Sequence, residues 1–268
     1  MTVRRVGSAA PDGYENPLVP GLRATAHAER LADELAFAAG RTAELAADPP
    51  GVYADIATAD DVEEAIWLAF LTAYVSPAEG DEPFAGIRAA HVPWSSGELP
   101  DLTGVPLGPR TAHDPARGLD TLNAYRAWAG RAGAQERALT GEPAWTPERR
   151  AERAFERLAL PGLHRGARLE LLASLGRLGV VNLRPAFLQL RGTDTATVAA
   201  KRVFGIADPL LIERRAGALA QAAGVPVDAI DLALFNWERP DGRATMGASA
   251  EAPELADRGP IAAALGVA

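Results

Sequence analysis

The chain has 268 residues, of which 48% are hydrophobic and 6% aromatic, and its formal net charge is −8. This length is sufficient for one large domain or two small lobes with a substantial core. The absence of cysteine excludes disulfides, thiolate zinc sites, iron–sulfur clusters and a cysteine nucleophile. The acidic balance argues against a surface that is basic throughout.

The first part of the chain predicts an irregular arm followed by two helices and a long loop. Residues 1–24 carry closely spaced Pro and Gly, which interrupt any periodic pattern. A helix is predicted over 25–47, and a second one, capped by Asp60 or Asp61, is predicted to reach Tyr74. The second helix is apolar nearly all round, so we expect it at the centre of the core. Residues 76–118 are rich in Pro, Gly and Asp and predict a long loop.

Apolar residues at helical spacing continue through the second half of the chain. Further helices are predicted over 120–140, 146–158, 165–178, 194–205, 208–224 and 226–237. Thr146 and Asp208 are suitable N-caps because each is followed by a proline at the first helical position. The segment 238–268 is small and polar and predicts a weakly ordered tail. Because no strand pattern of convincing length occurs, we expect an all-α protein whose residues 25–237 form a single helical domain.

Two turns in the region 146–237 contain glycine between predicted helices. The first is Leu-Pro-Gly-Leu-His-Arg-Gly at 160–166, and the second is Leu-Arg-Gly-Thr-Asp-Thr at 190–195, shortly before Phe204-Gly205. Glycine in such hairpins lets backbone N–H groups approach a DNA phosphate. This part of the chain resembles the C-terminal half of the helix-hairpin-helix DNA glycosylase superfamily (endonuclease III-like), and the chain is similar to a divergent member.

The resemblance implies a two-lobed helical fold with a helix-hairpin-helix-like C-terminal half, and it implies site residues. Glu213 stands where the family keeps its catalytic aspartate, which supports cleavage of an N-glycosidic bond. The alternative for Glu213 is a solvated residue that favours the dipole of its helix. The family's hairpin lysine has no counterpart here, so lyase chemistry is not expected. Lys201, the single lysine of the chain, lies on the helix that follows the second hairpin.

Basic residues gather in the same region. Residues 148–215 contain 13 Lys and Arg against 7 Asp and Glu, whereas the rest of the chain is strongly acidic. A local basic segment can bind a polyanion, although the same residues can also form ordinary ion pairs on helix surfaces. The predicted nucleic-acid-binding residues are Arg165, Arg191, Gly192, Lys201, Arg202, Arg214 and Arg215. Trp237 is a candidate for stacking on a base, with a place in the core as its alternative.

No metal or cofactor is expected, because the four histidines are scattered and show no ligand spacing. The longest apolar run, at residues 65–75, is too short to span a membrane, and we expect a cytoplasmic protein. Three functions remain open. The chain could be a glycosylase-like enzyme acting on DNA, a nucleotide or a modified base. It could be a non-catalytic protein that binds nucleic acid or a nucleotide, or a bacterial scaffold that binds another protein.

Overall fold

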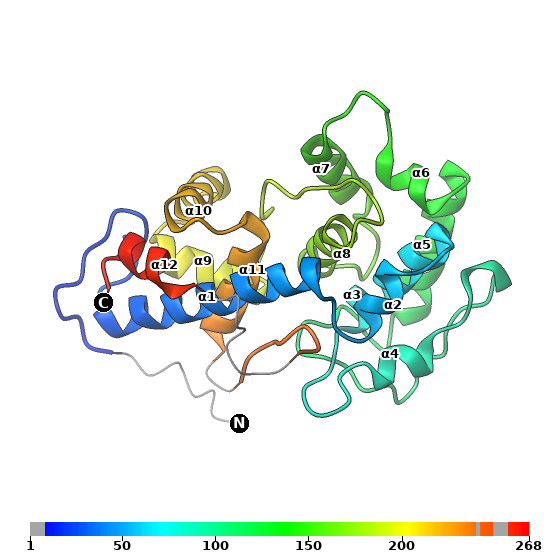
Figure 1. Cartoon of the computed structure of the whole chain (residues 1–268), viewed down its shortest axis with the longest axis horizontal. Helices are drawn as coiled ribbons and strands as arrows, with labels where there is room; N and C mark the ends of the chain where they lie inside the picture. The colour runs from blue at the N-terminus through cyan, green and yellow to red at the C-terminus, as the bar shows by residue number, and fades with distance from the viewer. Residues whose placement is uncertain (1–8, 240–241, 249–256, 268) are drawn as a thin grey trace. The chain divides into compact units, whose positions relative to one another are not determined.

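The computed structural model describes residues 9–239, 242–248 and 257–267. Every regular element in these ranges is a helix, which confirms the all-α class predicted from the sequence (Figure 1). The chain divides into two compact units. Unit 1 comprises the N-terminal residues up to Ala43, Phe187–Ala244 and the C-terminal residues from Ser249, and unit 2 comprises Glu44–Ala186 and Thr245–Ala248.

Unit 2 is organised around one central helix, α3 (Val62–Val75). Its other elements are α2 (Val52–Ala57), α4 (Ala85–Ala90), the 3-10 turn η1 (Trp94–Ser96), α5 (Gly118–Ala132), α6 (Gln135–Thr140), α7 (Pro147–Arg157) and α8 (Arg165–Arg177). Ten of the 14 residues of α3 are buried. Helices α2, α4, α6 and α8 and the turn η1 all pack against it. The expected central position of this apolar helix is therefore confirmed.

Aromatic rings join α3 to α5. Phe70 stacks on Tyr125 with ring centroids 3.7 Å apart, and Trp67 stacks on Phe70 at 5.5 Å. Arg126 covers this group from outside, with its guanidinium 4.3 Å from the ring centroid of Trp94. Such contacts add specific geometry to the burial of apolar area.

Unit 2 also differs from the sequence-based prediction. The helix predicted over 120–140 is two helices, because Gly133 ends α5 in the left-handed conformation with φ 83°. Glu63 then caps α6 from α3, since its carboxylate accepts hydrogen bonds from the backbone N–H groups of Gln135 (2.8 Å) and Glu136 (2.9 Å). The predicted loop 76–118 contains α4 and η1. Helices as short as these are stabilised mainly by tertiary packing, which a local pattern does not reveal.

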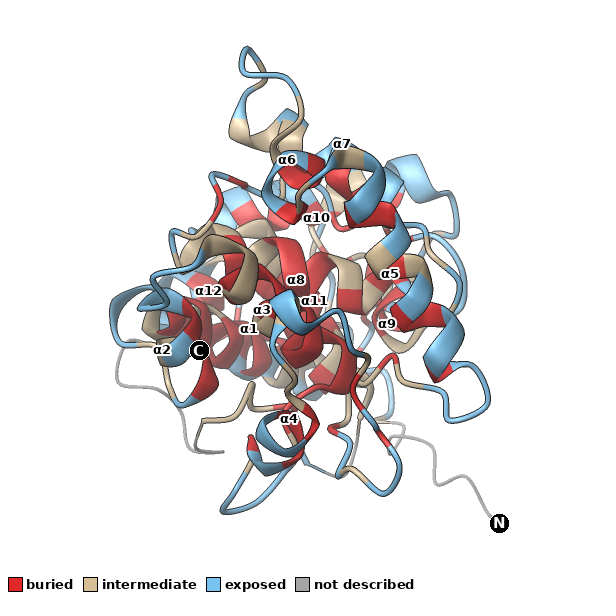
Figure 2. Cartoon of the chain, turned by 90° about the vertical axis from the view of Figure 1, so that its right-hand side faces the viewer, coloured by how far each residue is buried: buried red, intermediate tan, exposed pale blue. Residues whose placement is uncertain are grey.

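Unit 1 contains the first part of α1 (Thr25–Ala47) and four C-terminal helices. These are α9 (Thr195–Phe204), α10 (Pro209–Ala223), α11 (Val227–Glu238) and α12 (Arg258–Leu265). Helix α9 packs against α11, and α10 packs against α9, α11 and α12. Figure 2 marks the buried residues of these helices in red. Helix α12 lies within the tail that was predicted to be weakly ordered.

The N-terminal segment of unit 1 has no regular element over residues 9–24 but is fixed by specific bonds. The hydroxyl of Tyr14 donates to the Leu265 carbonyl at 2.6 Å, which attaches the segment to α12. The carboxylate of Asp12 accepts from the Thr25 backbone N–H at the start of α1. These hydrogen bonds lower the pKa of Asp12. A Cβ on Gly21 would lie 1.9 Å from the Arg202 carbonyl oxygen, so only glycine fits this approach to α9.

No single helix in the described ranges is both long enough and apolar enough to cross a membrane. Helices α10 and α11 meet the length and composition criteria only when they are taken together, and that pair is bent by 104°.

We predict that Glu63→Ala destabilises unit 2 by about 1–3 kcal/mol, because it leaves the backbone N–H groups of Glu136 and of the buried Gln135 without their acceptor at the start of α6. Glu136→Ala is the matched control, since the side chain of Glu136 is exposed on the same helix turn and should change stability by less than about 0.5 kcal/mol. Urea unfolding followed by tryptophan fluorescence measures both variants, because four of the five tryptophans lie in unit 2. Equal midpoints for the two variants would contradict the prediction.

Candidate nucleic-acid interface

The second predicted hairpin, Leu190–Thr195, forms an exposed turn in unit 1. Arg191, Gly192 and Thr193 are all exposed, and Gly192 has φ 111°. A Cβ built on Gly192 would meet no atom within 4 Å, so the space beside this backbone is open. The turn leads directly into α9, whose N-cap is Asp194. The Asp194 carboxylate accepts from the backbone N–H (3.3 Å) and the hydroxyl (2.6 Å) of Thr197. The sequence left Thr193 and Asp194 open as the cap of this helix, and the structure shows Asp194 in that role.

Glu213 binds the segment that precedes the hairpin. One carboxylate oxygen accepts from the Leu188 backbone N–H at 2.9 Å, and the other accepts from the Leu190 N–H at 2.8 Å. Asp208 caps α10 and Pro209 occupies its first position, as predicted, which places Glu213 within the first turns of the helix. Hydrogen bonds to an ionised acceptor are worth more than neutral ones. The two oxygens of Glu213 therefore hold the irregular backbone segment 188–190 in place.

Lys201 also binds the hairpin. Its ammonium group donates to the carbonyl oxygen of Gly192 at 2.9 Å. Three residues singled out from the sequence, Gly192, Lys201 and Glu213, are thus brought together by contacts within unit 1. The side chain of Arg214, which follows Glu213 directly, is exposed.

Three other predicted arginines form contacts within the protein or are buried. The guanidinium of Arg202 pairs with Glu238 at 2.6 Å and lies over the ring of Trp237. Arg215 donates to the Phe204 carbonyl at 2.6 Å, where α9 ends. Arg165 lies in unit 2 and only 6% of its surface is exposed. The basic segment 148–215 is thus divided between the two units.

Trp237 lies in the core and not at a surface where a base could stack. It is 1% exposed, and its indole N–H donates to the His27 carbonyl at 3.1 Å. The structure instead shows an exposed aromatic ring that the sequence analysis did not select. Phe187, beside Leu188, is 50% exposed. In the sequence, Phe187 lies in an apolar segment interrupted by Pro185. Nothing in that pattern indicates that Phe187 is exposed while its neighbour Leu188 is buried.

The first predicted hairpin, Leu160–Gly166, lies in unit 2 and is occupied by packing contacts. Gly162 has φ 75°, and a Cβ on it would lie 2.2 Å from the Thr121 hydroxyl oxygen. His164 is the N-cap of α8, since its Nδ1 accepts from the Ala167 N–H at 3.3 Å. Its Nε2 bonds to the Thr111 carbonyl at 2.9 Å. The glycine here accommodates α5, so the backbone at Gly162 is not open to a phosphate as the backbone at Gly192 is.

Within the described ranges, no group of three or more His, Asp or Glu side chains is placed to hold a metal ion. Comparison of the chain with models of known protein families, with curated proteins and with solved structures finds no match.

We predict that Gly162→Ala destabilises unit 2 more than Gly179→Ala does. Both glycines have nearly the same φ, 75° and 73°, but a Cβ at Gly179 meets no atom within 4 Å. The shared backbone strain costs about 1 kcal/mol, and the contact with Thr121 adds about 1–3 kcal/mol at Gly162 alone. Thermal unfolding compares the variants.

The double variant Gly162→Ala/Thr121→Ala serves as the control for this contact. Removing the Thr121 hydroxyl leaves room for the new methyl group, so part of the lost stability should return. Additive losses in the double variant would show that the contact with Thr121 is not the reason for the glycine.

Proposed function

We propose that unit 1 binds nucleic acid or a nucleotide through its Leu190–Thr195 hairpin. The observation that carries the proposal is the convergence of Gly192, Lys201 and Glu213 on this turn. An exposed glycine with open space beside it lets backbone N–H groups approach a phosphate closely. The resemblance of the same residues to a helix-hairpin-helix module supports the proposal independently of these contacts.

Two kinds of side chain around the hairpin suit a single-stranded or distorted nucleic acid. Arg191 and Arg214 are exposed, and each can neutralise a phosphate. Phe187 offers an exposed ring on which a base can stack, a contact that tolerates any base. Arg191 and Arg214 remain from the set expected from sequence, and Phe187 is added to it. The other candidates Arg165, Arg202, Arg215 and Trp237 are buried or occupied by contacts within the protein.

Glu213 has two possible roles in this site, and its contacts favour a positioning role. Both of its oxygens accept backbone N–H groups, so the carboxylate fixes the path of residues 188–190. A catalytic role in breaking an N-glycosidic bond, as the resemblance implies, is the second candidate. It rests on the place of Glu213 directly beside the hairpin, and each carboxylate oxygen retains a second lone pair.

Binding is measured by fluorescence anisotropy of labelled single- and double-stranded oligonucleotides over a range of salt concentrations. The affinity should fall steeply with salt, because bound phosphates release counterions. Arg191→Ala/Arg214→Ala should weaken binding to all sequences and reduce the slope of log K against log salt by about two. Arg131→Ala, an exposed arginine at the end of α5, is the control and should leave the slope unchanged.

Phe187→Ala tests the stacking contact separately. We expect weaker binding of the single strand, by about 1–3 kcal/mol, and an unchanged salt slope, since no charge is removed. If the wild-type protein binds neither oligonucleotide at low salt, or if the arginine variants match Arg131→Ala, the proposed function is wrong.

Glu213→Gln distinguishes the two roles of this residue. An amide can accept only one of the two backbone N–H groups and presents an NH₂ to the other, so a positioning role predicts weaker oligonucleotide binding and a loss of stability of about 1–3 kcal/mol. A catalytic role predicts that binding survives and that release of a modified base falls about 10²–10⁴-fold. The same preparation is measured in both assays, with Glu152→Gln, an exposed glutamate on α7, as a control for loss of charge.

A further inference from the structure

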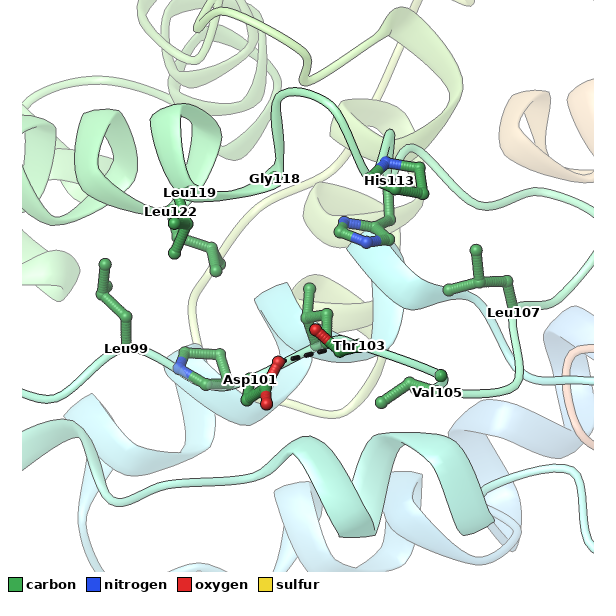
Figure 3. Close-up of a pocket in the computed structure, with 13 residues that line it drawn as sticks. Leu99, Asp101, Thr103, Val105, Leu107, His113, Gly118, Leu119 and Leu122 are labelled. Atoms are coloured by element: carbon green, nitrogen blue, oxygen red, sulfur yellow. Dashed lines mark hydrogen bonds between the residues drawn. The ribbon is translucent and has the colours of Figure 1, made fainter.

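Unit 2 contains a cavity of about 470 Å³ that is lined by residues of this unit alone (Figure 3). It is formed by the loop from Leu99 to Leu107, by His113 and by the start of α5. Its floor is buried, with Leu102 and Leu122 only 7% and 1% exposed, and its mouth includes Leu119, which is 64% exposed. A volume of this size is in the range of pockets that bind small molecules.

The last carbonyl groups of α3 hold one wall of this cavity in place. The Gly108 N–H donates to Val75 (3.2 Å) and Ser76 (3.1 Å), and the Ala112 N–H donates to Tyr74 at 2.9 Å. A Cβ on Gly108 would lie 2.0 Å from the Pro77 carbonyl oxygen, so this close approach needs glycine. The wall is therefore tied to the central helix of the unit, and the cavity is preformed.

His113 is the polar group at the centre of this wall. Its Nδ1 lies 3.2 Å from the Tyr74 hydroxyl, which fixes the ring, and a Cβ on Gly118 would lie 2.4 Å from its Cε1. Burial lowers the pKa of His113, and the carboxylate of Asp114 acts in the opposite direction, so the surroundings favour the neutral imidazole. Within the described part of the chain, Nε2 makes no hydrogen bond.

The other lining residues are mostly apolar. Figure 3 shows leucine side chains from the loop and from α5 around the imidazole. Of the two remaining polar side chains, Asp101 uses one oxygen to accept from the Thr103 N–H at 2.9 Å. An apolar lining with few polar groups selects ligands by shape and by one or two hydrogen bonds.

We propose that this cavity binds a small, uncharged, largely apolar ring compound whose single polar group forms a hydrogen bond with Nε2 of His113. The ring system lies between Leu102, Leu122 and the leucines at the mouth. The site is independent of the hairpin in unit 1, so it holds whether or not the protein binds nucleic acid.

Binding is tested with N-phenyl-1-naphthylamine, a neutral dye whose emission rises in apolar surroundings. The wild-type protein should show saturable binding with one site per chain. Leu119→Glu places a charge at the mouth and should weaken binding about 10-fold, because the carboxylate loses hydration beside the bound ring. Leu210→Glu is the matched control, since Leu210 is 71% exposed at the start of α10 in unit 1. This variant should bind the dye as the wild type does.

The hydrogen bond is tested by displacing the dye with 2-naphthol or with naphthalene. The wild type should prefer 2-naphthol about 3- to 10-fold, the difference expected from one neutral hydrogen bond. His113→Phe keeps a ring in the wall and should abolish this preference. Leu107→Glu, on the opposite side of the mouth, provides a second variant should Leu119→Glu fail to fold.

Three results would overturn the proposal. They are no saturable dye binding by the wild type, equal binding by Leu119→Glu, Leu107→Glu and Leu210→Glu, and a preference for 2-naphthol that survives in His113→Phe.

Discussion

Helix α3 is apolar on nearly every side, so almost none of its surface can be exposed to water. The packing of unit 2 satisfies this constraint. The ten buried residues of α3 occur on every side of the helix, so neighbours are required all round it. Five short elements supply them, and each is too short to be stable alone. The apolar helix and its covering are therefore mutually dependent. The aromatic contacts with α5 give the arrangement a fixed geometry.

The same helix explains why a proline- and glycine-rich loop is ordered. A buried helix end leaves carbonyl groups that need donors. Residues 108–112 provide these donors to Tyr74, Val75 and Ser76, and in doing so they carry His113 to the side of the cavity. An unsatisfied helix terminus thus becomes the anchor of a candidate ligand site. Similarly, Glu63 within α3 supplies the cap that α6 lacks in its own sequence.

The amino-acid sequence predicts those parts of the fold that local chemistry determines. Caps such as Asp194 and Asp208 and the apolar pattern of α3 are local signals, and the structure agrees with them. The break at Gly133 was missed because the apolar pattern continues through it. The structure brings Gly192, Lys201 and Glu213 together around one turn, and it gives Trp237 the core position that the sequence left open as its alternative. Burial of a single ring depends on distant residues such as His27, which no local pattern reports.

The contact between Lys201 and the Gly192 carbonyl has a practical consequence. Since every other basic side chain of the sequence is arginine or histidine, Lys201 is the one side-chain amine available to acylating reagents. Its ammonium must leave the carbonyl before it can react as a free amine. The rate of acylation at this residue, measured by mass spectrometry on the unaltered protein, therefore reports how readily the ammonium leaves the Gly192 carbonyl.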